Sequence, residues 1–352
     1  MGVFALGVEL DGEGFHPEAW RRAAHAPDRL LTADTVRERV TAAENAGFTL
    51  ATFADSILPD QGIPGRIDAV TRASFVAATT STIGLVPTVA TTYAEPFHTA
   101  SQVASLDYAS RGRAGWIAER VDDSRAAAAW GRQPVAGDAD LAREQRDSIE
   151  VARRLWDSWE DDAVIRDYSS GRFLDRNKLH YIDFQGETFS VKGPAIVPRP
   201  PQGQPVVFGT EGEVDVRFVA ADSVEAGAAA RSAGDSLVFA EVEVTLDVSG
   251  VPAAERFETI PGSPGRLTFS GPAEKLTDLL TELSTHLDGV RLHLAVIDED
   301  LVVLAREVLP ALLGTGIAHR PIPGSTLRAN LGLPRPANLG LPRPANRYAT
   351  TR

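Results

Sequence analysis

The stretch IGLVPTVATTYAEPFHTASQVASLDYASRGRAGWIAE, residues 83–119, carries the clearest folding signal in the chain. Apolar and β-branched residues fill 83–91 and 114–119 with little alternation, which is typical of strands that are covered on both faces. Between them, Pro96 lies in the first turn of a helical segment, and the glycines of GRAGW mark the turn back to a strand. The pattern predicts a strand, a crossover helix and a second, parallel strand.

The same alternation of strands and helices recurs along the chain. Further strands are expected at 3–10, 50–55, 205–209, weakly near Val224, 237–245 and 290–296. Asp34 and Asp68 are expected to cap two of the helices, Gly47 to end the first of them, and residues 141–159 to form a long fourth helix. Eight strands with interleaved helices in about 300 residues favour a β/α (TIM) barrel over a doubly wound open sheet. The active site of such a barrel lies where the strands end.

Two segments depart from this repeat. Residues 160–204 are polar, aromatic and interrupted by glycine and proline, which predicts an insertion with a small hairpin that roofs the site. The arm after the barrel contains LGLPRPAN twice, at 331–338 and 339–346. Two copies cannot build a repeat core, so the arm is interpreted as a tandem duplication that lies on the body or on a neighbouring subunit. We therefore expect one barrel domain over 1–320, with the insertion, and an arm over 321–352.

Composition and charge restrict the classes of function. The 352 residues include 35 Lys and Arg against 48 Asp and Glu, and the net charge of −13 argues against nucleic acid and anionic membranes as partners. The chain has no cysteine, which excludes disulfides and thiolate metal sites, and its histidines lack ligand-like spacing, so no metal site is predicted. The first residues lack the basic region of a signal peptide, and no apolar run reaches the roughly 18 residues of a membrane span. A cytoplasmic protein is expected.

Polar residues follow the predicted strands. Asp55, in the stretch FADS, either binds N–H and hydroxyl groups of a ligand or caps the next segment. Thr91 and Thr92 either contact a polar ligand or are ordinary strand-end residues. His16, in the first loop, and His98, in the first turn of a helix, are candidates for a general acid or base, with a packed structural histidine as the alternative.

Three glutamates provide a further hypothesis. Glu9, Glu119 and Glu211 follow different strands, and two of them would form the carboxylate pair of a barrel glycosidase if they converge. The motifs of phosphate-loop NTPases, zincins and α/β-hydrolases do not occur in the sequence.

Several longer blocks resemble the bacterial luciferase-like flavin monooxygenases, in the branch of nitrilotriacetate and dibenzothiophene-sulfone monooxygenases. These blocks are FADS, residues 83–116, GRFLDRNKLHYIDFQGETFSVKGPAIVPRPPQGQPVV at 171–207, and the terminal LGLPRPANRY. The resemblance implies a β/α barrel that takes reduced FMN from a separate flavin reductase, oxygenates a small organic substrate, and forms a homodimer or tetramer. By position, it places Asp55, Thr91 and Thr92 at the flavin, with Trp116 as part of a wall that excludes water.

The chain departs from the family pattern at the expected phosphate site. The loop after the fifth strand reads GTEGEVD, residues 209–215, so Glu211 and Glu213 would repel the phosphate of FMN. Arg120 and Arg217 are expected to compensate only if the loops are rearranged. Two hypotheses follow: a flavin-dependent monooxygenase with altered phosphate contacts or a deazaflavin, and a cofactor-free barrel that acts as a ligand-binding or subunit-partner protein.

Overall fold

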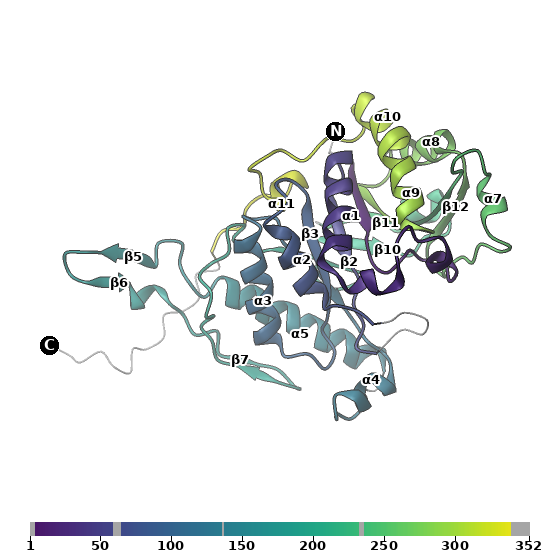
Figure 1. The fold of residues 1–352 in the computed structure, drawn as a ribbon. Coiled ribbons are helices and arrows are strands. Elements are labelled where there is room, and N and C mark those ends of the chain that lie inside the picture. The colour runs from purple at the N-terminus through teal and green to yellow at the C-terminus, as the bar shows by residue number, and fades with distance from the viewer. Residues whose placement is uncertain (1–3, 59–64, 136, 232–235, 339–352) are drawn as a thin grey trace.

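The chain folds into a closed barrel of parallel strands surrounded by helices (Figure 1). The computed structural model describes residues 4–58, 65–135, 137–231 and 236–338. β1 pairs with β2 and β13, and the pairing of β10 with β11 completes the ring, while β12 (Leu267–Gly271) adds to β11 outside it. The barrel strands are β1 (Ala5–Glu9), β2 (Leu50–Phe53), β3 (Gly84–Ala90), β4 (Gly115–Glu119), β9 (Val206–Gly209), β10 (Val216–Val219), β11 (Leu237–Leu246) and β13 (Gly289–Leu294). This ring confirms the predicted β/α barrel.

Helices pack their apolar faces on the outside of the barrel. Val40 and Leu280 of two helices share a core with Val8 and Leu292 of two strands, all of them buried. Within the described ranges, no helix has the length and apolar character that a bilayer crossing needs. The helices are α1 (Ala33–Ala46), α2 (Ala69–Ala77), α3 (Pro96–Ala109), α4 (Ser124–Ala129), α5 (Asp138–Trp156), α6 (Val224–Ala229), α7 (Ala253–Arg256), α8 (Ala273–Leu283), α9 (Ile297–Val303), α10 (Leu309–Gly314), α11 (Leu327–Asn330), a π-helical turn (Leu304–Val308) and 3₁₀ turns at Ala19–Arg22, Pro27–Leu31 and Arg176–Lys178.

Local sequence signals determine several helix ends. Asp68 caps α2 by accepting a hydrogen bond from the N–H of Thr71 at 2.7 Å. Pro96 begins α3, and Gly47 ends α1 in the left-handed conformation with φ of 105°. These three predictions are confirmed.

Other predicted helix boundaries are wrong. Asp34 lies inside α1, after the N-cap position Thr32, and pairs on the surface with Arg37 at 2.5 Å. The long helix expected over 141–159 is α5, which begins one turn earlier and ends at Trp156. Helix ends are set by caps and local packing, which the pattern of apolar residues does not resolve.

The sixth barrel strand is β10 (Val216–Val219), and the expectation of a strand near Val224 is wrong. Val224 begins α6, where Ser223 accepts a hydrogen bond from the N–H of Ala226 at 3.1 Å. β10 has four residues, and Arg217 interrupts its apolar run. A strand this short carries too weak a pattern to identify from the sequence.

The insertion contains two antiparallel hairpins, β5 (Val164–Asp167) with β6 (Arg172–Leu174) and β7 (Phe184–Gln185) with β8 (Ser190–Val191). It connects the end of α5 to the start of β9, and the hairpin of β5 and β6 projects from the body (Figure 1). Near its end, Gln202 donates hydrogen bonds to Asp107 at 2.6 Å and to the carbonyl of Ala114 at 2.8 Å, just before β4. The last residues of the insertion therefore lie at the amino-terminal end of the barrel, whereas Glu187, between β7 and β8, pairs with Arg143 of α5 at 3.1 Å. The role of the insertion as a roof over the site stays a prediction.

The amino-terminal end of the barrel is closed by α11. Leu327 of this helix is fully buried and faces the starts of β3 and β4. A Cβ atom added to Gly84 would lie 2.6 Å from Leu327, and one added to Gly115 would lie 2.8 Å from Phe208. Glycine at these strand starts therefore makes room for an apolar plug, which leaves the opposite end of the barrel for the site.

Candidate active site

A cavity of about 370 Å³ opens at the carboxyl ends of β2 and β4. This size falls within the range of roughly 300–1,000 Å³ that is usual for small-molecule sites. Apolar residues of the segments after the two strands form part of its wall, and charged residues lie among them. The apolar residues include Ile57, Leu58 and Val121, and the charged residues are Asp55, Arg66, Glu119, Arg120 and Asp123.

Glu119 is the last residue of β4. Of the carboxyl groups that line this cavity, its side chain has the most strongly shifted pKa. Among the residues that the structure describes, no hydrogen-bond partner contacts its side chain. Glu119 is exposed at the mouth, but desolvation of its carboxyl group raises the pKa of Glu119 to about 7. The charges of Arg291 and Arg66 oppose this shift, and those of Asp55 and Glu9 contribute to it. The group is therefore suited to hold or release a proton near neutral pH.

Below the mouth, charged residues inside the barrel bind one another. Arg291 of β13 pairs with Glu9 of β1 and with Glu241 of β11, the latter at 3.1 Å, and donates to the hydroxyl of Thr52 at 3.0 Å. Burial opposes ionisation of Glu241, but the hydrogen bond with His293 and the charge of Arg291 lower the pKa of Glu241 to about 2. The charged groups of this network therefore pair with one another.

The other two glutamates of the glycosidase hypothesis are bound elsewhere. Glu9 pairs with Arg291 and accepts a hydrogen bond from the N–H of Ala54 at 3.0 Å. Glu211 pairs with Arg120 at 2.9 Å. Glu119 therefore has no free glutamate beside it with which to share the roles of nucleophile and acid.

The loop after β9 places Glu211 and Glu213 on the surface. Arg120 bridges Glu211, at 2.9 Å, and Asp138 at the start of α5, at 3.0 Å. Arg120 thus already neutralises Glu211, and the expectation that compensation at a phosphate site needs rearranged loops stays a prediction. Arg217 donates a hydrogen bond to the carbonyl group at the end of α6, at 2.9 Å.

Asp55 is a predicted flavin contact that lines the cavity. Its carboxylate accepts hydrogen bonds from the N–H of Ser56 at 2.8 Å and of Ala69 at 2.7 Å. It therefore orders the start of α2, and its role as a flavin contact stays a prediction.

Thr91 and Thr92 bond to backbone groups of two cavity residues, and Trp116 belongs to the core that β4 shares with α5. Thr91 donates to the carbonyl of Glu119 at 2.9 Å, and Thr92 accepts from the N–H of Val121 at 3.1 Å, which ties the end of β3 to the segment after β4. Trp116 is 1% exposed and donates through Nε1 to a carbonyl of β3 at 3.1 Å. The roles of these residues as flavin contacts stay predictions.

His16 and His98 are not part of the described cavity wall. The buried ring of His16 stacks on Phe257 at a centroid distance of 3.6 Å, and its Nε2 lies 2.8 Å from the carbonyl oxygen of Thr259. His98 is exposed on the first turn of α3. A catalytic role for either histidine stays a prediction.

A second group of side chains converges near the first loop. Glu13, His25 and Asp298 bring ligand atoms within 4.8 Å of one another, although the sequence suggested no ligand role for His25. Arg39 lies among them, 2.6 Å from Glu13 and 2.9 Å from Asp298. The guanidinium group already neutralises these acids, so we assign no metal to them.

Comparisons with known proteins agree with this geometry. N-acetyl-S-(2-succino)cysteine monooxygenase of Bacillus subtilis is 29% identical over 94% of this chain and 97% of its own length. Nitrilotriacetate monooxygenase component A of Aminobacter aminovorans is 35% identical over 57% of this chain and 48% of its own length. The solved structure of EDTA monooxygenase from Chelativorans has the same fold, with a TM-score of 0.80 at 21% identity and coverage of 95% of this chain and 99% of that one.

A family model described as luciferase-like monooxygenase matches residues 14–231, which is more than half of the chain. This match and the relatives confirm the resemblance and the class of enzyme that the sequence predicted. The chain belongs to the luciferase-like monooxygenase family.

Proposed function

We propose that the chain binds reduced FMN at the mouth of the barrel and oxygenates a small organic substrate there. The observation that carries this proposal is the cavity of about 370 Å³ at the ends of β2 and β4, with the Glu119 carboxyl group in its wall. Membership of the luciferase-like monooxygenase family supports the reaction class.

The residues at the mouth suit a flavin ring. An isoalloxazine ring combines apolar faces with a rim of hydrogen-bond donors and acceptors. Ile57, Leu58 and Val121 offer apolar contact, and Asp55 offers a carboxylate that binds N–H groups.

The phosphate group requires an exchange of partners at Arg120. Its present partners Asp138 and Glu211 have side chains that are 84% and 59% exposed. Ion pairs this exposed contribute only about 0–1 kcal/mol, whereas a guanidinium forms strong bidentate hydrogen bonds with phosphate. We infer that the FMN phosphate displaces both acids from Arg120, so the acidic loop weakens FMN binding without preventing it.

The chain's own contribution to the reaction is binding, orientation and proton transfer. Reduced flavin supplies the electrons with which oxygen is activated. Glu119 is present in both protonation states near neutral pH, because its pKa is about 7. We therefore assign to Glu119, before His16 or His98, the role of moving a proton to or from the reacting groups.

The source of reduced flavin and the assembly are also part of the proposal. One relative is named component A, a name that marks a protein with another component. We infer a separate flavin reductase as the partner of this chain, and a homodimer or tetramer as its assembly. Turnover with NADH and an added flavin reductase, and light scattering of the purified chain, test these two inferences.

Binding of FMN and riboflavin tests the cofactor and the role of Arg120. We expect the chain to quench the fluorescence of oxidised FMN, and to bind reduced FMN in anaerobic calorimetry. Arg120→Ala should weaken FMN binding by roughly tenfold, since it removes a charged hydrogen bond to phosphate, and should leave riboflavin binding unchanged. Glu211→Gln should strengthen FMN binding only.

A matched control is Arg125→Ala, which removes an exposed arginine of α4 that does not line the cavity. Equal effects of Arg120→Ala on FMN and riboflavin would contradict the phosphate assignment. Absence of binding of both flavins, oxidised and reduced, would overturn the proposal in favour of a deazaflavin or a barrel without cofactor.

A further inference from the structure

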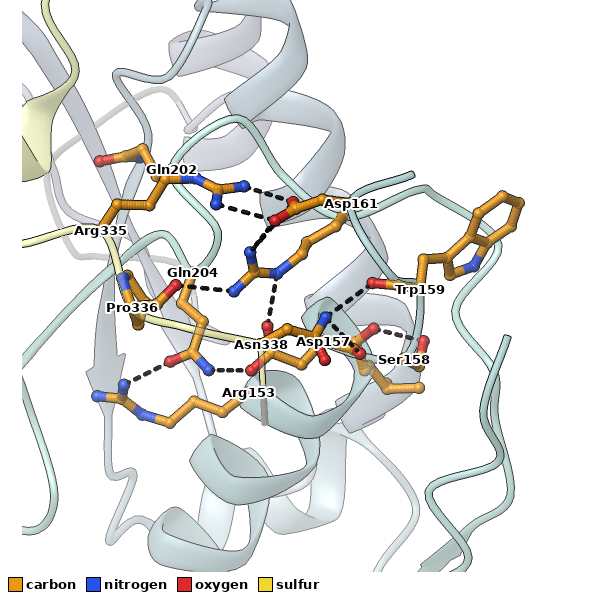
Figure 2. A network of polar contacts seen from close by, with 12 residues as sticks. Arg153, Asp157, Ser158, Trp159, Asp161, Gln202, Gln204, Arg335, Pro336 and Asn338 are labelled. Atoms are coloured by element: carbon orange, nitrogen blue, oxygen red, sulfur yellow. Dashed lines mark hydrogen bonds and ion pairs between the residues drawn. The ribbon is translucent and has the colours of Figure 1, made fainter. Parts of the chain in front are cut away.

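The RPAN half of the first copy lies against polar groups of residues 157–161 and 199–203, which we call the arm groove (Figure 2). Arg335 of this copy forms a bidentate ion pair with Asp161, with distances of 2.6 Å and 3.1 Å. The hydrogen bond from Arg335 lowers the pKa of Asp161 to about 2, aided by Arg199. Asp161 therefore stays ionised over a wide pH range while it pairs with Arg335 and Arg199.

Buried residues position the rest of the groove. The side chain of Arg199 is 2% exposed and donates to the carbonyl of Pro336 at 2.9 Å and to Asp157 at 2.8 Å. Asn338 donates to the carbonyls of Asp157 at 3.2 Å and Trp159 at 3.0 Å (Figure 2). The backbone and side chain of the arm are thus both recognised.

The chain carries two identical ligands for this one groove. The polar contacts come from Arg335, Pro336 and Asn338, in the RPAN half of the first copy. The second copy, residues 339–346, repeats RPAN with the same spacing at 343–346. Every group that the groove recognises in the first copy is therefore present a second time, eight residues later.

We propose that the arm groove is a binding site for the RPAN motif and that the second copy exchanges with the first on it within one chain. Leu331 is buried, and Leu333 packs with it in the core near Leu327. The exchange leaves these leucines in place. Pro334 alone connects Leu333 to the RPAN motif of the first copy, whereas the nine residues 334–342 connect Leu333 to the RPAN motif of the second copy.

The tether favours exchange within the chain over binding to another molecule. Loop-closure entropy rises slowly with length, and a short flexible tether gives an effective concentration in the millimolar range. The first copy needs no such loop, so it remains the main occupant, and the second copy takes the groove when the first is impaired.

Hydrogen–deuterium exchange of the full chain, read at residues 157–161 and 199–203, tests this redundancy. Docking of either copy protects these segments from local opening. Arg335→Ala and Arg343→Ala should each leave the exchange rates within about twofold of wild type, and the double variant should exchange at least about tenfold faster, because a charged hydrogen bond is lost from both copies. The peptide LGLPRPAN should restore protection to the double variant, and LGLPAPAN should not.

Arg347→Ala, in the arm but outside both copies, is the control and should behave as wild type. Loss of protection in Arg335→Ala equal to that of the double variant would overturn the proposal, as would full protection in the double variant. Protection of Arg335→Ala that appears only at high protein concentration would mean that the second copy binds another molecule, which also contradicts exchange within one chain.

Discussion

Glu119 and Arg120 are neighbours in sequence but have opposite electrostatic situations. Arg120 is neutralised by Glu211 and Asp138, two acids at the surface. Glu119 faces the cavity, where desolvation raises its pKa to about 7 although Arg291 and Arg66 act in the opposite direction. At the scale of single residues, the chemistry of the mouth therefore depends on how the fold pairs and desolvates each charge.

The substitution Glu119→Gln should change how stability depends on pH. The pKa of this group rises from 4.5 to about 7 on folding, so between these values the native state holds the proton more tightly than the unfolded chain. Its contribution to stability is therefore complete below pH 4.5 and is lost as the pH rises through 7. Urea unfolding of both proteins over this range should show that the wild type loses stability relative to Glu119→Gln as the pH rises.

Glu213→Gln removes the same charge from an exposed position that does not line the cavity and serves as the control. Parallel pH curves for wild type and Glu119→Gln would remove Glu119 from its assigned role. Flavin binding by Glu119→Gln at low pH should stay unchanged, because the neutral amide resembles the protonated acid.

At the scale of elements, helix starts depend on individual side chains that look alike in the sequence. Asp68 and Asp34 both precede apolar helical patterns, but only Asp68 accepts a backbone hydrogen bond at a helix start. Asp68→Ala should therefore lower the free energy of unfolding by about 1 kcal/mol. Asp34→Ala, the matched control, should stay within about 0.5 kcal/mol of wild type, because it removes only surface ion pairs. Denaturant unfolding measures both, and equal losses would contradict the assigned caps.

At the scale of the whole molecule, the barrel interior has an apolar end and a charged end. Phe208, Phe218 and Phe239 pack together below, with ring centroids 5.9–6.5 Å apart, and Leu327 plugs that end. Above them, Arg291 links β1, β2, β11 and β13 through Glu9, Thr52 and Glu241. The network lies close enough to the mouth for the charges of Arg291 and Glu9 to act on Glu119, so it influences the site as well as linking the four strands.

Arg291→Ala should destabilise the barrel strongly. The substitution leaves the buried Glu9 without its cation, whereas Glu241 keeps Arg266 at 3.8 Å and His293 at 3.0 Å. Breaking a buried pair in this way costs about 3–5 kcal/mol. Arg231→Ala, which breaks a pair with Asp288 at 2.9 Å in which Arg231 is 45% exposed, should cost less than about 1 kcal/mol. Thermal and urea unfolding compare the two, and a similar small loss in both would show that the buried network is not needed for stability.

The sequence by itself determined the order of strands and helices, most helix signals and, through its resemblance to known monooxygenases, the family. Continuous apolar runs, Asp68, Pro96 and Gly47 act locally, so their effects can be inferred without knowing the rest of the chain. The tertiary structure decided the positions of β10 and the insertion, the partner of Arg120 and the acidity of Glu119. Each of these depends on contacts between segments far apart in the sequence, and charge pairing and burial arise only when those segments meet.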